Sequence, residues 1–332
     1  MFQTRFAAAL ALTLACGAAQ AGPSGYHLAE RIPGPDGGWD YAAVNPLHNT
    51  VLVGRGAHIM TIDLATKAVN GAFADASGAH AALPINGGTQ ILVTTGRSDT
   101  ATIVDGASGA LLATIATGKN PDAATFDTAT GLVLVMNHSG GDITLIDPLA
   151  RVAVGSIAVG GKLEAAAVDG AGKAFVNVED LNEVVAIDLK ARKVLAHYKL
   201  VACEGPTGIA YAPADNLLIT TCDGVADVLN AKTGQSVAMI KTGDGADGVV
   251  FDPKSKLAFV SAGESGTLSV ISIAKGKARL VDTVPTQTRA RTIALDPRDG
   301  ALYLPTAKSG PPAPNGRPTT LPGSFEVLVV RK

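Results

Sequence analysis

The chain carries a repeat with a period of about 42 residues, and self-similarity at a fixed period of this length indicates a repeat architecture. Six positions mark the period at nearly equal spacing, each directly after a short apolar run such as IMTI, ATIV or VVAI: Asp63, Asp105, Asp147, Asp188, Asn230 and Ser272. Each unit holds about four short runs of strand type separated by Gly, Asn, Asp and Pro, which predicts a small antiparallel sheet and not a helical pair. Sheets that repeat at this period form the blades of β-propellers.

The third repeat shows the four expected strands most clearly. They are predicted at residues 124–127, 132–136, 143–147 and 152–159, with Gly131, Gly140, Gly141 and Pro148 in the turns between them. The same order of strands recurs from five other starting points: Trp39, Ala79, Leu163, Pro206 and Ala246.

A seventh copy begins at Ala290 and reaches the end of the chain without a fourth strand. At the other end, residues 26–32 read as a strand that belongs to no repeat, so they can supply the missing outer strand. That pairing would join the termini and remove the exposed sheet edges of an open array. We therefore expect an all-β fold: one domain over residues 22–332, a seven-bladed propeller of four-stranded antiparallel blades, closed by residues 26–32.

Residues 1–21 predict a secretory signal peptide. They combine Arg5, an apolar stretch from Phe6 and the small-residue site Ala19-Gln20-Ala21, with cleavage expected after Ala21. A lipoprotein signal that uses Cys16 is the alternative. The apolar stretch is too short to span a bilayer, and no later segment has the roughly 18 apolar residues that a membrane helix needs. We therefore expect a periplasmic or secreted protein with no membrane span, and a monomer.

Composition argues for a large buried core and against nucleic acid as a partner. Mean hydropathy is +0.26 and 17% of residues are charged. Without residues 1–21 the chain keeps 26 basic and 29 acidic residues, a formal charge of −3. Binding to a polyanion needs a basic groove, and single strands also need stacking aromatics, yet the chain has a single tryptophan, Trp39.

Two cysteines, Cys203 and Cys222, remain beyond residue 21. An even number in an exported protein favours a disulfide, with a metal pair or two free thiols as alternatives. A disulfide here would close a loop of about 20 residues and contribute roughly 3 kcal/mol on chain-entropy grounds.

Three segments resemble the YVTN-repeat propellers, in particular the YncE-like exported proteins: LVLVMNHSGGDITLID (132–147), KAFVNVEDLNEVVAIDL (173–189) and LAFVSAGESGTLSVIS (257–272). The similarity covers essentially all residues after 21. The chain departs from the family's usual Pro-x-Gly start of the first strand, which it keeps only at Pro206-Thr207-Gly208. The resemblance implies a seven-bladed propeller in the periplasm or cell envelope, and it assigns no biochemical role.

The repeat also predicts where chemistry is possible. Because strands alternate in direction, the turn before the first strand and the turn after the second strand of every blade lie on one face. Seven equivalent positions at the start of the first strand form an expected ring around one channel mouth: Asp40, His80, Asp122, Glu164, Thr207, Asp247 and Arg291. Residues after the second strand form an expected outer ring that includes Arg55, Arg97 and His138.

Crowding like charges around a narrow axis costs free energy unless a cation, water or ligand offsets it. This predicts a ligand site formed by Asp40, Arg55, His80, Arg97, Asp122, His138, Glu164, Asp247 and Arg291. A divalent-metal site at His80, Asp122 and Glu164 is a further hypothesis, because mixed nitrogen and oxygen ligands suit zinc or a transition metal. The alternative is that a water-filled channel simply needs polar walls. No other cofactor is indicated.

Two functions follow from this face. The first is a non-enzymatic exported propeller that binds a small molecule or an envelope protein. The second is a metal-dependent lyase or hydrolase in which His80, beside Asp40 or Asp122, acts as a general base. A long, proline-rich insertion at residues 309–323 falls on the same face, and it predicts either a lid or partner-docking segment or a tolerated surface insertion.

Overall fold

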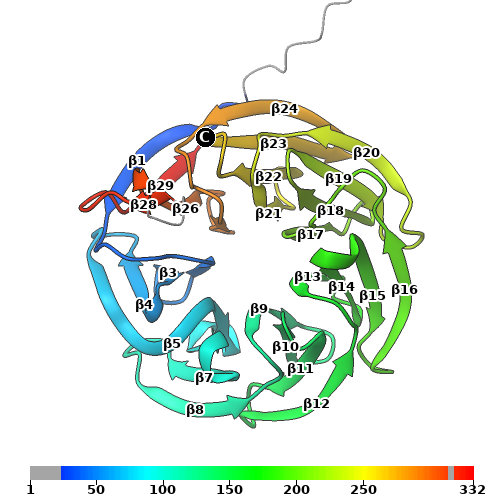
Figure 1. Ribbon diagram of the computed structural model, residues 1–332, viewed down its shortest axis with the longest axis horizontal. Helices are drawn as coiled ribbons and strands as arrows, with labels where there is room; N and C mark the ends of the chain where they lie inside the picture. Colours follow the sequence, from blue (N-terminus) through cyan, green and yellow to red (C-terminus); the bar gives the residue numbers. More distant parts are fainter. Residues whose placement is uncertain (1–23, 313–317) are drawn as a thin grey trace, which may run out of the picture.

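The computed structural model describes residues 24–312 and 318–332. Most of its strands form four-stranded antiparallel sheets, and the sheets stand radially around a central axis, the arrangement of a β-propeller (Figure 1). The predicted signal peptide at residues 1–21 lies outside the described residues. Within the described parts, no helix is long and apolar enough to cross a membrane.

The third repeat forms the sheet that the sequence predicts. Its strands are hydrogen-bonded in the order β12-β11-β10-β9. They are β9 (Pro121–Asp127), β10 (Leu132–Asn137), β11 (Asp142–Asp147) and β12 (Val152–Ala158). β9 is the innermost strand and β12 the outermost (Figure 1).

The next three repeats form sheets of the same kind, each paired in chain order. One contains β13 (Leu163–Val168), β14 (Lys173–Val178), β15 (Glu183–Asp188) and β16 (Lys193–Lys199). The second contains β17 (Ile209–Ala212), β18 (Leu217–Cys222), β19 (Val225–Asn230) and β20 (Ser236–Lys241). The third contains β21 (Ala246–Asp252), β22 (Leu257–Ala262), β23 (Thr267–Ala274) and β24 (Lys277–Pro285).

The first two repeats are joined in one seven-stranded sheet through the long strand β5 (Val69–Ile85). β5 pairs with β4 up to Ala79 and with β6 from Ala79 onward, so it is the last strand of one repeat and the first of the next. The other strands are β2 (Ala42–Asn45), β3 (Thr50–Gly54), β4 (Gly56–Asp63), β6 (Gln90–Thr95), β7 (Thr100–Asp105) and β8 (Leu111–Ala116).

Strands from the two ends of the chain share a sheet. β1 (His27–Pro33) pairs antiparallel with β29 (Glu326–Arg331), and the sheet continues through β26 (Leu302–Thr306) to β25 (Ala294–Leu295). Figure 1 shows β1, in blue, beside β29, in red. Within the described part of the 309–323 insertion, β27 (Ser309–Pro312) pairs with β28 (Pro318–Thr320). Short 3-10 turns occupy other connections, at Asn86–Gly88, Gly96–Ser98 and Glu179–Leu181.

The core lies between neighbouring sheets. Middle strands such as β10 and β15 are almost continuously apolar and buried, whereas outer strands such as β16 alternate between exposed and half-buried residues. One buried cluster joins β10 and β11 to β14 and β15, and another joins β3 and β4 to β26 and β29. Each sheet therefore depends on its neighbours to bury its apolar faces.

The aspartates that mark the period have a structural role. The Oδ1 atom of Asp63 accepts hydrogen bonds from the backbone N–H groups of Ala65 and Thr66. Asp105, Asp147 and Asn230 make the equivalent bonds in their own repeats. These side chains close the turn into the outermost strand, which is the common use of Asx residues at such positions.

Candidate functional site

All seven ring positions predicted from the sequence meet in one cavity of about 330 Å³. We call this set the channel ring: Asp40, His80, Asp122, Glu164, Thr207, Asp247 and Arg291. The rest of the cavity wall comes from Tyr41, Asn120, His138, Glu179 and Thr292. The prediction from the repeat, that equivalent positions of successive units converge on one mouth, agrees with this arrangement.

Neighbouring sheets hold the backbone of the ring. The Thr94 hydroxyl, at the end of β6, donates to the backbone oxygen of Asp122 on the next sheet at 2.5 Å. Equivalent bonds run from Asn177 to Thr207, from Thr221 to Asp247 and from Ser261 to Arg291. The Asp40 backbone oxygen instead accepts from Thr292, which lies just before β25. Each bond fixes the point at which a ring side chain leaves the backbone, so the site is set by contacts between sheets.

The His80 backbone is held differently, by close approach to a glycine. A Cβ atom at Gly54 would lie 2.1 Å from the His80 carbonyl oxygen, so only glycine permits this contact. Gly54 also exchanges backbone hydrogen bonds with Asp40 and Tyr41.

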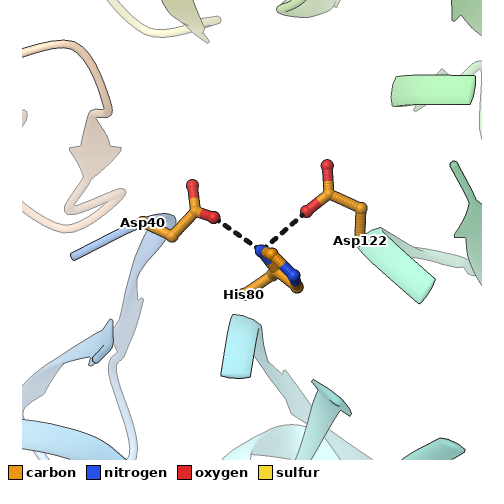
Figure 2. Close-up of side chains that lie close together, drawn as sticks. All are labelled: Asp40, His80 and Asp122. Atoms are coloured by element: carbon orange, nitrogen blue, oxygen red, sulfur yellow. Dashed lines mark hydrogen bonds and ion pairs between the residues drawn. The ribbon is translucent and has the colours of Figure 1, made fainter. Parts of the chain in front are cut away.

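His80 lies between two carboxylates (Figure 2). Its Nδ1 atom is 2.7 Å from Oδ2 of Asp40 and 3.2 Å from Oδ1 of Asp122. The hydrogen bond to Asp40 is the main cause that raises the pKa of His80, and the charge of Asp122 adds to it against the opposing effect of burial. His80 therefore carries more positive charge near neutral pH than a solvated imidazole.

A second histidine repeats this arrangement on the other side of Asp122. The Nδ1 atom of His138 lies 3.0 Å from Oε1 of Glu164 and 3.2 Å from the Leu163 carbonyl oxygen. Ligand atoms of Asp122, His138 and Glu164 all lie within 4.8 Å of one another, as do those of Asp40, His80 and Asp122. Asp122 thus belongs to both clusters.

Arg291 lies on the other side of Asp40 from His80. One of its terminal nitrogens lies 2.8 Å from Oδ2 of Asp247, and the other lies 3.5 Å from Oδ1 of Asp40. Burial disfavours the charge of Arg291, but the two carboxylates outweigh it and raise its pKa, so it stays charged.

The carboxylates nevertheless outnumber the groups that neutralise them. Burial, followed by the charge of Asp40, raises the pKa of Asp122 to about 6. Burial, followed by the charge of Asp122, raises the pKa of Glu164 to about 8. Burial also raises the pKa of Asp247 despite its contact with Arg291. These crowded carboxyl groups therefore keep protons that solvated ones release, and Glu164 above all is protonated near neutral pH. A cationic ligand would favour their charged forms.

The structure groups the proposed metal ligands differently from the sequence hypothesis. His80 and Asp122 meet with Asp40, whereas Glu164 joins Asp122 and His138. Both sets offer one imidazole nitrogen and two carboxylate oxygens, a donor set that suits zinc or another divalent transition metal. The three successive ring positions therefore do not form one cluster, because His138 of the outer ring, and not His80, lies beside Glu164.

Arg55 and Arg97 do not line this cavity. The Arg55 guanidinium lies 3.7 Å from the centre of the Phe325 ring and donates to the carbonyl oxygens of Gly38 and Pro35. Burial there lowers the pKa of Arg55 to about 10. Arg97 lies in the turn after β6, is exposed, and packs against Gly78. The side chains of these turns point toward neighbouring loops. The repeat period alone does not predict this direction.

A wider depression of about 900 Å³ adjoins the ring and shares Thr207, Asp247 and Arg291 with it. Trp39 and Arg289 lie in its wall, with the Arg289 guanidinium 4.8 Å from the centre of the Trp39 ring. Arg289 also donates to the carbonyl oxygen of Thr319 in β28, so the described part of the 309–323 insertion is docked beside this depression. The remainder of that insertion, residues 313–317, lies outside the described residues.

Cys203 and Cys222 form the predicted disulfide pair, with their Cα atoms 5.3 Å apart. Both are buried in the cluster between β14–β15 and β18–β19. Sequence reasoning missed Tyr41, which follows Asp40 and lines the cavity although it belongs to no charged pattern.

The fold defines the protein as a β-propeller, and solved structures agree. Similar chains occur in the crystal structure of a mitotic checkpoint complex (TM-score 0.74, 17% identity, covering 100% of this chain and 98% of that one) and in hydrazine synthase of Kuenenia stuttgartiensis (TM-score 0.72, 17% identity, covering 90% and 98%). U3-55K matches with a TM-score of 0.73 at 11% identity, covering 90% of this chain and 97% of that chain. At these identities the likeness concerns the fold alone. No protein-family model matches the sequence, and no curated protein matches it.

Proposed function

We propose that this protein is an exported, non-enzymatic β-propeller that binds a small organic cation at the channel ring. The observation that carries the proposal is the composition of the ring, which contributes four carboxyl groups against one arginine and one histidine to a single cavity of about 330 Å³. An ammonium group can donate to several of these carboxylates at once, and each such charge-assisted bond is worth about 1.5–3 kcal/mol. The excess charge selects a cation over an anion.

The proposal includes a closed ring of seven blades. Divided at Ala79 of β5, the seven-stranded sheet supplies two four-stranded units, and the other four-stranded sheets supply five more. The pairing of β1 with β29 supports closure by the N-terminal strand. We also propose membership of the YVTN-repeat, YncE-like group and export by a signal peptide cleaved after Ala21. Sequencing the N-terminus of the exported protein tests the cleavage site, and an uncleaved chain would refute it.

Calorimetric titration with methylammonium, tetramethylammonium and guanidinium tests the cation site directly. We expect saturable binding at one site, and about tenfold or greater weakening in Asp122→Asn and Glu164→Gln. Asp75→Asn is the matched control, because Asp75 is 95% exposed and lies away from the channel. Acetate and phosphate serve as anion controls. If no cation binds, or if the control weakens binding as much as the ring variants, the proposal fails.

Cation binding should also release protons. A bound cation stabilises the charged forms of Asp122 and Glu164, whose pKa values are about 6 and 8 in the free protein. Affinity should therefore rise as pH increases from 6 to 8. Titrations at pH 7 in buffers of different ionisation enthalpy measure the released protons, and buffer-independent heats would contradict this linkage.

A second candidate function is a metal-dependent lyase or hydrolase, and a specific observation favours it. Two clusters of three ligand atoms share Asp122, each with one imidazole. A divalent metal held there would act as a Lewis acid or activate water. Metal analysis and metal-induced thermal stabilisation, compared between the unaltered protein and His80→Ala, separate this function from the first. Absence of bound metal together with absence of metal-induced stabilisation would exclude it.

A further inference from the structure

Below the charged cavity, the residues that line the channel change from charged to small and apolar. A second cavity of about 210 Å³ shares Tyr41, Asp247 and Thr292 with the charged cavity above it. Its other wall residues are small or apolar and lie in or directly before the innermost strands: Ala42 and Ala43, Ala81 to Leu83, Ala123 and Ala124, Ala165 and Ala166, Gly208 and Ile209, Gly248 and Val249, and Ile293. The channel wall therefore does not stay polar below the ring. A simple water-filled channel, the alternative that the sequence left open, would need polar walls along its length.

Tyr41 lies between these two cavities. It precedes β2, yet it packs against the apolar cluster of β9–β11 and β13–β15, to which Ala123 and Leu163 belong. Its side chain therefore extends from its own sheet across the channel toward another part of the ring. Two hydrogen bonds hold the backbone at Tyr41. The Gly54 N–H group donates to the Tyr41 carbonyl oxygen at 3.0 Å, and the Asp40 N–H group donates to the Gly54 carbonyl oxygen at 3.0 Å.

Tyr41 lines the charged cavity together with the carboxylates of the channel ring. Burial, then the charges of Asp122 and Glu164, raise its pKa well above the ordinary value, so the hydroxyl stays protonated. Among the residues that the structure describes, it has no hydrogen-bond partner in the protein. The hydroxyl oxygen can therefore accept a hydrogen bond from an N–H group of a bound cation, and the aromatic ring beneath presents an apolar face to the lower cavity.

We propose that Tyr41 is the floor of the cation site and limits its ligands to compact cations, such as methylated ammonium or guanidinium ions without a long tail. The inference rests on the proposed cation site and deepens it by naming the size class of the ligand. The lower cavity is then the next part of the channel, which a longer apolar tail of a ring-bound cation reaches only when the aromatic ring is removed. Tyr41 is a specificity-determining residue in this proposal.

A series of n-alkylammonium ions from methyl to octyl, titrated against the full mature protein, tests the floor. In the unaltered protein, affinity should stop rising after the shortest members. In Tyr41→Ala, which joins the two cavities, each added methylene should strengthen binding roughly fourfold until the lower cavity is filled. Tyr41→Phe keeps the ring without the hydroxyl, so it should retain the length limit. Tyr41→Leu preserves apolar packing with a shorter side chain, and it replaces the alanine variant if the latter does not fold.

A parallel series of neutral n-alkanols, followed by thermal shift, separates the floor from the cation site. Alkanols that stabilise Tyr41→Ala or Tyr41→Leu increasingly with length, but not the unaltered protein or Tyr41→Phe, support the floor even if ammonium ions fail to bind. In that case the proposed cation site is wrong, but the proposal that Tyr41 separates the two cavities is supported. Equal chain-length dependence in the unaltered protein and the alanine or leucine variant, with either series, overturns the floor. So does a loss of the length limit in Tyr41→Phe.

Discussion

The Oδ2 atom of Asp40 lies 2.7 Å from Nδ1 of His80, although the two residues begin successive repeats and are 40 positions apart. The other oxygen of Asp40 faces Arg291, 251 positions away in the last repeat. One carboxylate thus links the first repeat to the second and to the seventh. The charge pattern of the channel ring consequently depends on how the ends of the chain meet.

Asp40→Asn should lower the pKa of His80. The hydrogen bond that His80 donates to Asp40 is the largest cause of the raised pKa, and the amide keeps the size of the side chain while removing its charge. Nuclear magnetic resonance titration of the imidazole gives the value directly. Asp75→Asn is the control, since it should leave the His80 titration unchanged. An unaltered His80 pKa in Asp40→Asn would show that the contact with Asp40 does not govern the ionisation of the imidazole.

Glu164→Gln should alter the dependence of stability on pH. The pKa of Glu164 is about 8 in the folded protein and 4.5 in the reference state, so between these values the folded state holds the extra proton. Stability therefore falls as pH rises through this window, because the unfolded state loses its proton first. The glutamine variant lacks this loss, and above pH 8 it should be more stable than the unaltered protein by on the order of a few kcal/mol.

Urea unfolding at pH 5, 7 and 9 measures this difference. The comparison between the two proteins cancels the contributions of other titrating groups that the substitution leaves alone. Parallel stability profiles for Glu164→Gln and the unaltered protein would contradict the prediction.

Removal of residues 22–33 should destabilise the whole propeller, since it exposes the outer edge of β29 and deletes Ile32 from the core. A milder test is Ile32→Ala, which should cost about 2–5 kcal/mol because Ile32 packs with Val327 and Val329. Leu111→Ala is the control, because Leu111 is 63% exposed on the outer strand β8. A truncated protein that unfolds at the same temperature as the intact one would exclude closure by β1.

The double substitution Cys203→Ala/Cys222→Ala should lower the free energy of unfolding by roughly 3 kcal/mol, the chain-entropy value for a loop of this size. The two cysteines are 19 positions apart and buried, so the bond ties the connection before β17 to the end of β18. Equilibrium unfolding in urea measures the loss. Val201→Ala, on the same connection but 97% exposed, should change stability little. Equal stabilities of the double variant and the unaltered protein would show that the bond does not stabilise the fold.

Much of the channel ring was predictable because one position in each repeat has one place in the fold. The spacing of Asp40, His80 and Asp122 follows the period, so knowing the strand order was enough to place their backbones on one face. The directions of the Arg55 and Arg97 side chains were not predictable in this way. Both follow the second strand of a blade, but Arg55 stacks on Phe325 and Arg97 packs against Gly78. Side-chain direction in a turn depends on the neighbouring loop, which the period does not encode.

The sequence by itself determined the four-stranded repeat, the positions of its turns and the residues that begin each innermost strand, because these depend on local periodicity and turn chemistry. Only the tertiary structure decided which charges meet. The sharing of Asp122 between His80 and His138, and of Asp40 between His80 and Arg291, follows from distances between sheets. The path of Tyr41 across the channel is likewise a matter of packing, since its ring fills space that no single repeat contains.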